Sequence, residues 1–331
     1  MMKKALIGIG LALLVVSPAL SAVVGMTDDP MSVGGGARPL GMGRAFAAVA
    51  DDADAPFINP AGIAGLKGPQ AMSMFTNLLG EVYYTEFSGA VPAPFGTVGM
   101  GYINTGISQV LIPTGSSFVY SDYYDTLLTM TYSTPLSRFF IYGRNIFVGG
   151  NLKLFSRGWT GGYSESASGF DADLGAKLVV TPNLSFGINR QNIVPLSLGG
   201  VIKMSSGAEE ALAGITKVGV AIKPVPLRGD VLFAYDVDLP AQSGRPVTMH
   251  AGAEWQVNKY FALRGGADQS VDAASPSGTS WNPTVGISTG YAGFRIDFTH
   301  HPYYNDPGLA ENYISLSYQG APKYAFSSEV R

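Results

Sequence analysis

From about residue 70 onwards, apolar and polar residues alternate along the chain. In residues 294–299, Phe294, Ile296 and Phe298 alternate with Arg295, Asp297 and Thr299. The same alternation occurs in residues 184–189, 231–238 and 314–319. Successive side chains of a β-strand point to opposite faces of its sheet, so this period of two predicts strands with one apolar face and one polar face.

The alternation predicts about fourteen strands. They are expected at residues 70–78, 82–92, 95–105, 122–134, 143–157, 167–180, 182–190, 213–223, 228–238, 246–257, 258–268, 281–290, 291–301 and 311–320. Many of them have the length that a tilted strand needs to cross a membrane. Strand counts of twelve or sixteen remain open at this point.

The links between the expected strands alternate in length. Most links after odd-numbered strands are long, at residues 106–121, 158–166, 191–212, 239–245, 269–280 and 302–310. Most links after even-numbered strands are tight; residues 135–142 and the short first hairpin fit this pattern least well. Outer-membrane barrels have short periplasmic turns and longer extracellular loops, whereas a soluble sandwich has no reason to sort its loops in this way. We therefore expect an all-β fold, a transmembrane antiparallel β-barrel of about fourteen strands at residues 70–320.

The first 22 residues have the features of a secretory signal peptide. Lys3 and Lys4 precede an apolar run over residues 5–16, and small residues follow at 18–22. No later segment has 18 uninterrupted apolar residues, so the sequence excludes a helical membrane protein. We expect an exported protein in the outer membrane of a Gram-negative-type bacterium, in contact with membrane lipid.

Composition agrees with a barrel. Of 331 residues, 46% are apolar and only 14% are charged, with 43 Gly, 17 Phe, 17 Tyr and no Cys. The net charge of −3 comes with no basic patch, so no nucleic-acid partner is expected. Trp159, Trp255 and Trp281 fall at expected strand ends, where an interfacial aromatic girdle would need them.

Charged residues on the polar strand faces should line the lumen, because charge facing hydrocarbon is costly. These are Glu86, Lys153, Asp171, Asp173, Lys177, Asp236, Glu254, Arg264, Arg295 and Asp297. Their signs are mixed, whereas a selective ion pore would have rings of one sign. We expect them to pair with one another or with a plug, as a structural network rather than a transport path.

Residues 23–69, ahead of the barrel, form the expected plug. Residues 44–50 have helical spacing and predict a short helix that ends near Asp51 and Asp52. Asn59 before Pro60 and Ala61 is a turn signal, and Pro60 suits the first position of a second short helix. Arg44, Asp51 and Asp52 are available to meet the charged wall.

Three blocks in this segment carry a family resemblance. They are Gly-Ala-Arg-Pro-Leu-Gly-Met-Gly-Arg-Ala-Phe at 36–46, which includes Gly41 and Gly43, Ala-Asp-Asp at 50–52, and Asn-Pro-Ala-Gly at 59–62. They resemble the N-terminal signature of the FadL-like outer-membrane superfamily, and their spacing is most similar to the PorV/PorQ branch. The resemblance implies a fourteen-stranded barrel with an N-terminal plug that contains Asn59, Pro60 and Ala61.

The same resemblance implies transport of hydrophobic small molecules, which leave sideways at a kinked third strand. Gly96, Gly99 and Gly101 in the expected third strand could allow such a kink, or could provide close packing against the plug. Two features depart from the family: residues 321–331 form a polar tail, and the loops are modest.

Catalytic chemistry is scarce in this sequence. The pair His300 and His301 has no Cys or Glu nearby at metal-ligand spacing. His250 and Glu254 form an inward-facing pair on one strand, but no Gly-x-Ser-x-Gly or comparable element accompanies them, so no metal, cofactor or enzymatic activity is expected. Two functions stay open: passive transport of hydrophobic molecules, and a PorV-like role in which the barrel binds exported cargo or a secretion system of type IX. A general porin is disfavoured because a plugged lumen blocks diffusion.

Overall fold

The computed structural model describes residues 25–27, 29–139, 145–224, 230–272, 275–303 and 306–322. The predicted signal peptide at residues 1–22 and residues 323–331 of the predicted tail lie outside the described residues. The boundaries proposed for these segments therefore stay predictions.

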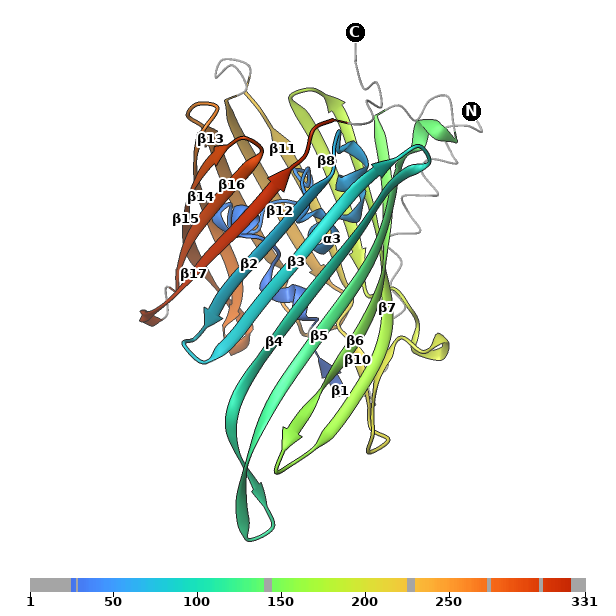
Figure 1. The fold of residues 1–331 in the computed structure, drawn as a ribbon, viewed down its shortest axis with the longest axis vertical. Helices are drawn as coiled ribbons and strands as arrows, with labels where there is room; N and C mark the ends of the chain where they lie inside the picture. The colour runs from blue at the N-terminus through green and yellow to red at the C-terminus, as the bar shows by residue number, and fades with distance from the viewer. Residues whose placement is uncertain are drawn as a thin grey trace.

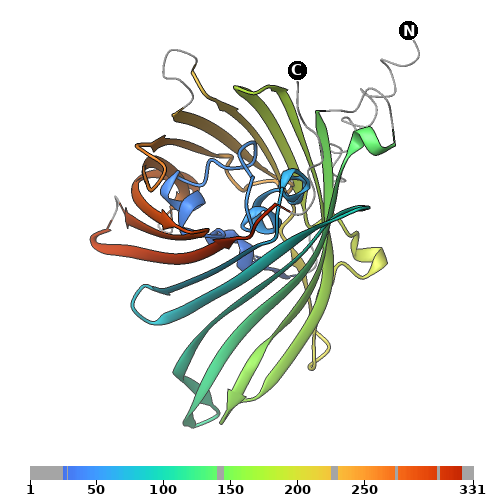
Figure 2. The ribbon, with the colours of Figure 1, turned by 45° about the horizontal axis from the view of Figure 1, so that its top comes forward.

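Fourteen antiparallel strands close into a barrel (Figures 1 and 2). They are β2 (Gln70–Leu78), β3 (Val82–Ala93), β4 (Gly96–Thr114), β5 (Ser117–Pro135), β6 (Ile146–Gly161), β7 (Glu165–Thr181), β8 (Leu184–Gln191), β11 (Ile215–Ile222), β12 (Val231–Pro240), β13 (Thr248–Gln256), β14 (Phe261–Asp272), β15 (Ser275–Tyr291), β16 (Phe294–Tyr303) and β17 (Asp306–Gln319). Each pairs with its neighbours in sequence, β17 pairs with β2, and β8 pairs with β11 to close the wall. The predicted fold class is confirmed.

Several strands are longer than predicted. Residues 106–121, expected as a loop, are mostly strand, because β4 and β5 continue as a two-stranded ribbon beyond their neighbours (Figure 1). Trp281 lies inside β15 rather than at its end, since β15 begins at Ser275. These segments are rich in Ser, Thr, Gly and Pro, which are turn residues by composition, but hairpin pairing holds them in extended form.

The link at 191–212 also contains structure that the sequence did not predict. It holds the 3₁₀ helix η4 (Leu196–Leu198) and the short strands β9 (Val201–Met204) and β10 (Glu209–Leu212). β9 pairs with β7, and β10 pairs with β9 and, in parallel, with β1 (Gly25–Thr27). Strands of four residues are too short to show a reliable period of two.

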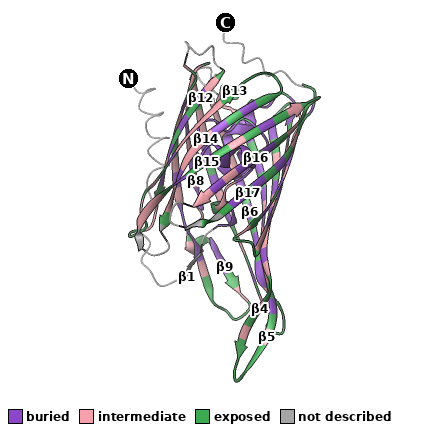
Figure 3. Cartoon of the chain, turned by 90° about the vertical axis from the view of Figure 1, so that its left-hand side faces the viewer, coloured by how far each residue is buried: buried purple, intermediate pink, exposed green. Residues whose placement is uncertain are grey.

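Exposed and buried residues alternate along the wall strands (Figure 3). In β16, Phe294, Ile296 and Phe298 point outward and are 54%, 49% and 37% exposed, while Asp297 is fully buried on the inner face. The outward surface is therefore apolar over most of the wall, far beyond what a soluble monomer exposes. Within the described residues, no helix is both long enough and apolar enough to cross a membrane.

Residues 29–69 lie inside the barrel (Figure 2). They contain the 3₁₀ helix η1 (Pro30–Val33), the helices α2 (Ala37–Gly41) and α3 (Ala55–Ile58), and the 3₁₀ helix η2 (Pro60–Gly65). The second predicted helix is present as η2, which Asn59 caps by accepting a hydrogen bond from the Ala61 N–H.

The predicted helix at residues 44–50 is wrong, since these residues form turns. Arg44 has a φ of 66°, a left-handed conformation that interrupts a right-handed helix. The backbone N–H groups of Phe46 and Ala47 both donate to Asp236 of β12, at 2.7 Å each. The barrel wall thus supplies the hydrogen bonds that a helix would have made internally.

Candidate functional site

Glycines on the inner wall surround the plug. Nine of them would each bring a side chain against residues 41–63: Gly99, Gly101, Gly149, Gly175, Gly187, Gly219, Gly252, Gly266 and Gly286. Three pairs face each other directly across neighbouring strands, namely Gly149 with Gly175, Gly187 with Gly219, and Gly252 with Gly266. We call this set the glycine ring. The glycines of this ring have no side chains. The plug therefore packs closely against the backbone of the wall strands.

The predicted motif glycines of the plug meet this ring. Gly43 has a φ of 57° and lies against Gly266, and Gly41 lies against Gly286. A Cβ on Gly43 would lie 2.6 Å from the backbone nitrogen of Ala267, so only glycine fits. The Gly-Met-Gly block is therefore a contact surface of the plug.

The three glycines of the possible lateral-gate strand lie in β4. Gly99 and Gly101 belong to the glycine ring and face Ile63 and Phe57 of the plug, while Gly96 begins the strand. From Gly96 to Gly106, β4 pairs with β3 without a register shift. The pairing of β4 with β5 has a register shift farther along the strand, between Ile107 and Val110. At these glycines the described wall is closed.

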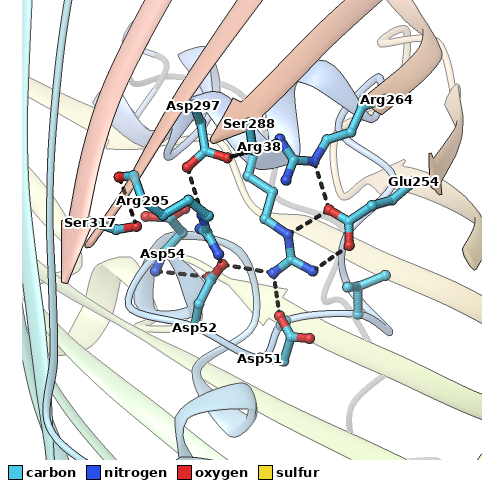
Figure 4. A network of polar contacts seen from close by, with 12 residues as sticks. Arg38, Asp51, Asp52, Asp54, Glu254, Arg264, Ser288, Arg295, Asp297 and Ser317 are labelled. Atoms are coloured by element: carbon cyan, nitrogen blue, oxygen red, sulfur yellow. Dashed lines mark hydrogen bonds and ion pairs between the residues drawn. The ribbon is translucent and has the colours of Figure 1, made fainter. Parts of the chain in front are cut away.

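A buried ion network joins the plug to β13–β16 (Figure 4). Arg38 of α2 donates two hydrogen bonds to Glu254, at 2.8 and 2.9 Å, and others to Asp52 at 2.8 Å and Asp51 at 2.5 Å. Bidentate arginine–carboxylate pairs are among the strongest hydrogen-bonded contacts in proteins. Sequence reasoning assigned the plug's cationic role to Arg44 and missed Arg38, although Arg38 lies in the same motif.

The network continues along the wall. Arg264 contacts Glu254 at 2.6 Å and Asp297 at 2.9 Å. Arg295 contacts Asp297 at 2.8 Å and returns to Asp52 at 3.3 Å. Each of these carboxylates has at least two cationic partners, so the mixed lumen charges are paired with one another and with the plug.

Other predicted lumen charges hold the plug by different contacts. Lys153 is fully buried and binds Asp29 of the plug at 2.6 Å and Asp173 at 2.8 Å. Lys177 donates to the Ala50 carbonyl at 3.0 Å, and Glu86 accepts from the Gly36 N–H at 3.1 Å. Asp171 lies apart from the plug and accepts from the Val194 N–H at 2.9 Å.

The predicted Asn-Pro-Ala turn bridges the plug and the wall. Asn59 is fully buried; its amide donates to the Ala47 carbonyl at 2.8 Å and to the Ala176 carbonyl of β7 at 3.1 Å. A Cβ on Gly149 would lie 2.6 Å from the Pro60 carbonyl carbon and 2.7 Å from the Ala61 nitrogen. The Asn59 side chain thus links the Ala47 segment of the plug and the turn at residues 59–61 to β7 of the wall.

Arg44 contacts a different part of the wall. It donates to the Ser32 carbonyl, and its guanidinium lies 3.8 Å from Asp268. Asp268 also contacts His250 at 2.8 Å and His301 at 3.3 Å. Among the described residues, no group of three or more side chains is arranged to hold a metal ion.

Asp54 is a buried carboxylate of the plug with an unpartnered oxygen, Oδ1. Burial, followed by the charges of Asp52 and Glu86, raises the pKa of Asp54 well above its usual value. A plug carboxyl in this environment favours its neutral form.

An aromatic pocket opens on the inner wall near the β4–β5 ribbon. Its volume is about 210 Å³, and its lining combines Tyr123, Trp159, Ala167 and Met204 with the charged Arg157, Glu165 and Glu210. The rings of Tyr123 and Trp159 lie 5.0 Å apart. The prediction that Trp159 belongs to an outward girdle is therefore wrong. Trp159 has the same parity along β6 as the buried Lys153, which was a usable sequence signal.

Beyond this pocket, deeper in the barrel, the inner wall has an apolar row. Ile103, Leu127 and Phe155 are neighbours by strand register, and Ile202 of β9 follows beside Gly169. All four side chains are at most 3% exposed. The ion pair of Asp125 and Arg157, at 2.9 Å, lies between this row and the rings of Tyr123 and Trp159 along β5 and β6. Periodicity alone did not lead us to expect an apolar row on the inner wall.

A larger, polar cavity of about 620 Å³ lies at the opposite end of the plug. Arg38, Asp52, Glu254 and Arg295 of the ion network line it, together with residues of the turns at 257–260 and 292–293.

The barrel is similar to solved structures of transport proteins. The CymD monoaromatic hydrocarbon channel aligns with a TM-score of 0.59 at 13% identity, over 86% of this chain and 96% of that one. The Pseudomonas putida toluene transporter TodX gives 0.54 at 12% identity, over 81% and 94%. A FadL homologue of Pseudomonas aeruginosa gives 0.54 at 11% identity, over 84% and 97%.

The chain has the fold of these transport proteins. No family model matches it, and no curated protein matches its sequence. The FadL-like resemblance expected from the plug motif is thus supported at the level of fold, while its finer placement near PorV and PorQ is not shown.

Proposed function

We propose that this protein is a passive channel for hydrophobic small molecules in the outer membrane of a Gram-negative-type bacterium. The observation that carries the proposal is the barrel fold, which is similar to the CymD and TodX channels. The inner wall adds apolar surface at two places, the rings of Tyr123 and Trp159 and the buried row of Ile103, Leu127 and Phe155, with the ion pair of Asp125 and Arg157 between them. Burial of apolar surface is the driving force by which such surfaces would extract a hydrophobic molecule from water.

Tyr123 and Trp159 give the aromatic pocket a surface for a small aromatic substrate, beside the charged Arg157, Glu165 and Glu210. Its volume of about 210 Å³ accommodates a single-ring hydrocarbon, and Tyr123 and Trp159 offer ring faces for edge or offset stacking. The substrates named for CymD and TodX, monoaromatic hydrocarbons and toluene, are of this size class. We therefore propose monoaromatic hydrocarbons as the first substrates to test.

The plug decides the direction in which a substrate leaves. The glycine ring and the ion network leave the plug fitted against the wall, and the polar cavity beyond it is unfavourable for an apolar molecule. A sideways exit into the bilayer avoids both obstacles. The β3–β4 wall near Gly96, Gly99 and Gly101 stays the predicted place, and it would have to open, since its strands are fully paired.

The alternative function, a PorV-like component of a secretion system, lacks a supporting observation. The similar structures reported above are small-molecule transport proteins rather than secretion components or enzymes.

Uptake of radiolabelled toluene tests the proposal in cells that lack their own hydrocarbon channel. The wild-type protein should raise the initial uptake rate at low toluene concentration. Trp159→Glu should reduce that rate to the level of cells without the channel, because it removes the larger of the two rings on which an aromatic substrate would stack.

Tyr120→Ala is the matched control, since Tyr120 lies on the same strand as Tyr123 but is 67% exposed and lies outside the pocket. Its uptake rate should equal that of the wild type. Comparable barrel yields on unheated gels establish that both variants fold. Wild-type uptake no faster than in control cells, or unaffected uptake in Trp159→Glu, would contradict the proposal.

A further inference from the structure

The outward face of β2, β3 and β4 contains an apolar groove of about 530 Å³. Its outward-pointing lining residues are Ala71, Phe87, Gly89, Val91, Val98, Met100 and Tyr102. Phe87 and Val91 are each 52% exposed and Met100 is 59% exposed, so these side chains face away from the lumen. We call this feature the outer groove.

The outer groove exists because two small residues face each other where the surrounding side chains are large. Ala71 pairs with Gly89, and Gly89 pairs in turn with Met100. A Cβ on Gly89 would meet only the Gln70 carbonyl oxygen, at 3.4 Å. The fold therefore does not require glycine at this position, unlike at the members of the glycine ring. The depression is left unfilled by the protein itself.

The lining chemistry narrows the possible ligand. No charged residue lines the outer groove, and the ring centroids of Phe87 and Tyr102 lie 6.5 Å apart along its side. The volume lies within the usual range of small-molecule sites, roughly 300–1,000 Å³. All of its outward-pointing lining side chains are apolar or aromatic. A flexible apolar chain matches this arrangement.

We propose that the outer groove binds one acyl chain of a phospholipid from the surrounding bilayer. This inference rests on the membrane location in the proposed function. The groove is continuous with the apolar outer surface of the barrel, so a lipid chain reaches it without leaving hydrocarbon. A lipid held there covers the β3–β4 wall from outside and should exchange more slowly than lipid at the rest of the surface.

Native mass spectrometry of the purified barrel, reconstituted with phosphatidylglycerol and then transferred to detergent, tests the proposal. The wild type should retain one phosphatidylglycerol molecule after extensive delipidation. Gly89→Leu should lower the retained fraction at least tenfold, because a leucine side chain fills the groove. Ala71→Leu provides an independent second variant with the same expected result.

Thr85→Leu is the matched control: Thr85 lies on the same strand and the same outward face as Gly89 but does not line the groove. It should retain lipid as the wild type does. Equal retention in Gly89→Leu and Thr85→Leu, or no retained lipid in the wild type, overturns the proposal. Displacement of the lipid by toluene also overturns it, since the groove would then belong to the substrate's route.

Toluene uptake by the same variants separates this inference from the proposed function. Retained lipid in a protein without uptake activity would refute the channel and leave the lipid site standing. Normal wild-type uptake with no retained lipid would refute only the lipid site.

Discussion

Replacing Gly266 by alanine tests whether the glycine ring fits the plug against the wall. A Cβ at this position would overlap the backbone nitrogen of Gly43 and lie 2.5 Å from the carbonyl carbon of Met42. Both obstacles are backbone atoms, and Met42 also rests against Gly252 on the neighbouring strand. The plug has little room to move aside, so the cost should be that of an overpacked core.

The neighbouring Gly265 provides the matched control. It faces outward, and a Cβ there would meet only the Thr284 carbonyl oxygen, at 3.9 Å. Removing a glycine from a strand interior is favourable by about 0.5–1 kcal/mol, because the unfolded chain loses conformational freedom. Overpacking typically costs about 1–3 kcal/mol. The gain from removing a glycine is common to both variants, so Gly266→Ala should unfold at a free energy about 1–3 kcal/mol lower than Gly265→Ala.

Reversible urea unfolding of the refolded barrel in lipid vesicles measures this difference, with tryptophan fluorescence as the signal. Single-channel recordings provide a second readout, because a displaced plug should allow current through Gly266→Ala but not through Gly265→Ala. If the two variants had equal unfolding midpoints and equally low conductance, the glycine ring would not be a tight contact and the reasoning would be refuted.

Three other variants test the remaining contacts of the plug. Arg38→Met should lower the free energy of unfolding in the same urea assay by about 3–5 kcal/mol, because it leaves buried Glu254 and Asp52 with one fewer cation; an unchanged midpoint would contradict the role of the network. Asn59→Ala should cost about 1–3 kcal/mol by leaving buried carbonyl groups unpaired, and intact stability would show that water replaces the amide. The pKa of Asp54 is higher in the folded protein than the value of 3.8 expected for the unfolded chain. Its contribution to the free energy of unfolding is therefore fully present below pH 3.8 and is lost as pH rises through the folded pKa. Asp54→Asn should therefore be more stable than the wild type at neutral pH, and urea midpoints across a pH series should show this advantage shrinking towards pH ~4.

The local pattern of the sequence determined the wall. A period of two is set by the strand backbone itself, so alternation in segments such as residues 294–299 was sufficient to predict strands and which residues face inward. Phe155 and Trp159 have the same parity as Lys153, but the strand predicted at residues 143–157 ended before Trp159, which was therefore placed in a girdle at the strand end. The alternation of long and short loops then favoured a membrane barrel over a soluble sandwich.

Only the tertiary structure decided what the inside of the barrel does. Arg38 meets Glu254 across 216 positions of sequence, and Phe46 meets Asp236 across 190. Such pairs depend on barrel closure and on the register of every intervening strand, which no local period encodes. The predicted helix at residues 44–50 was lost for the same reason, because hydrogen bonds to a distant strand replaced those of a helix. The plug motif could be recognised from the sequence. The glycine ring that it contacts consists of nine positions far apart in the sequence, which only folding brings together around the plug.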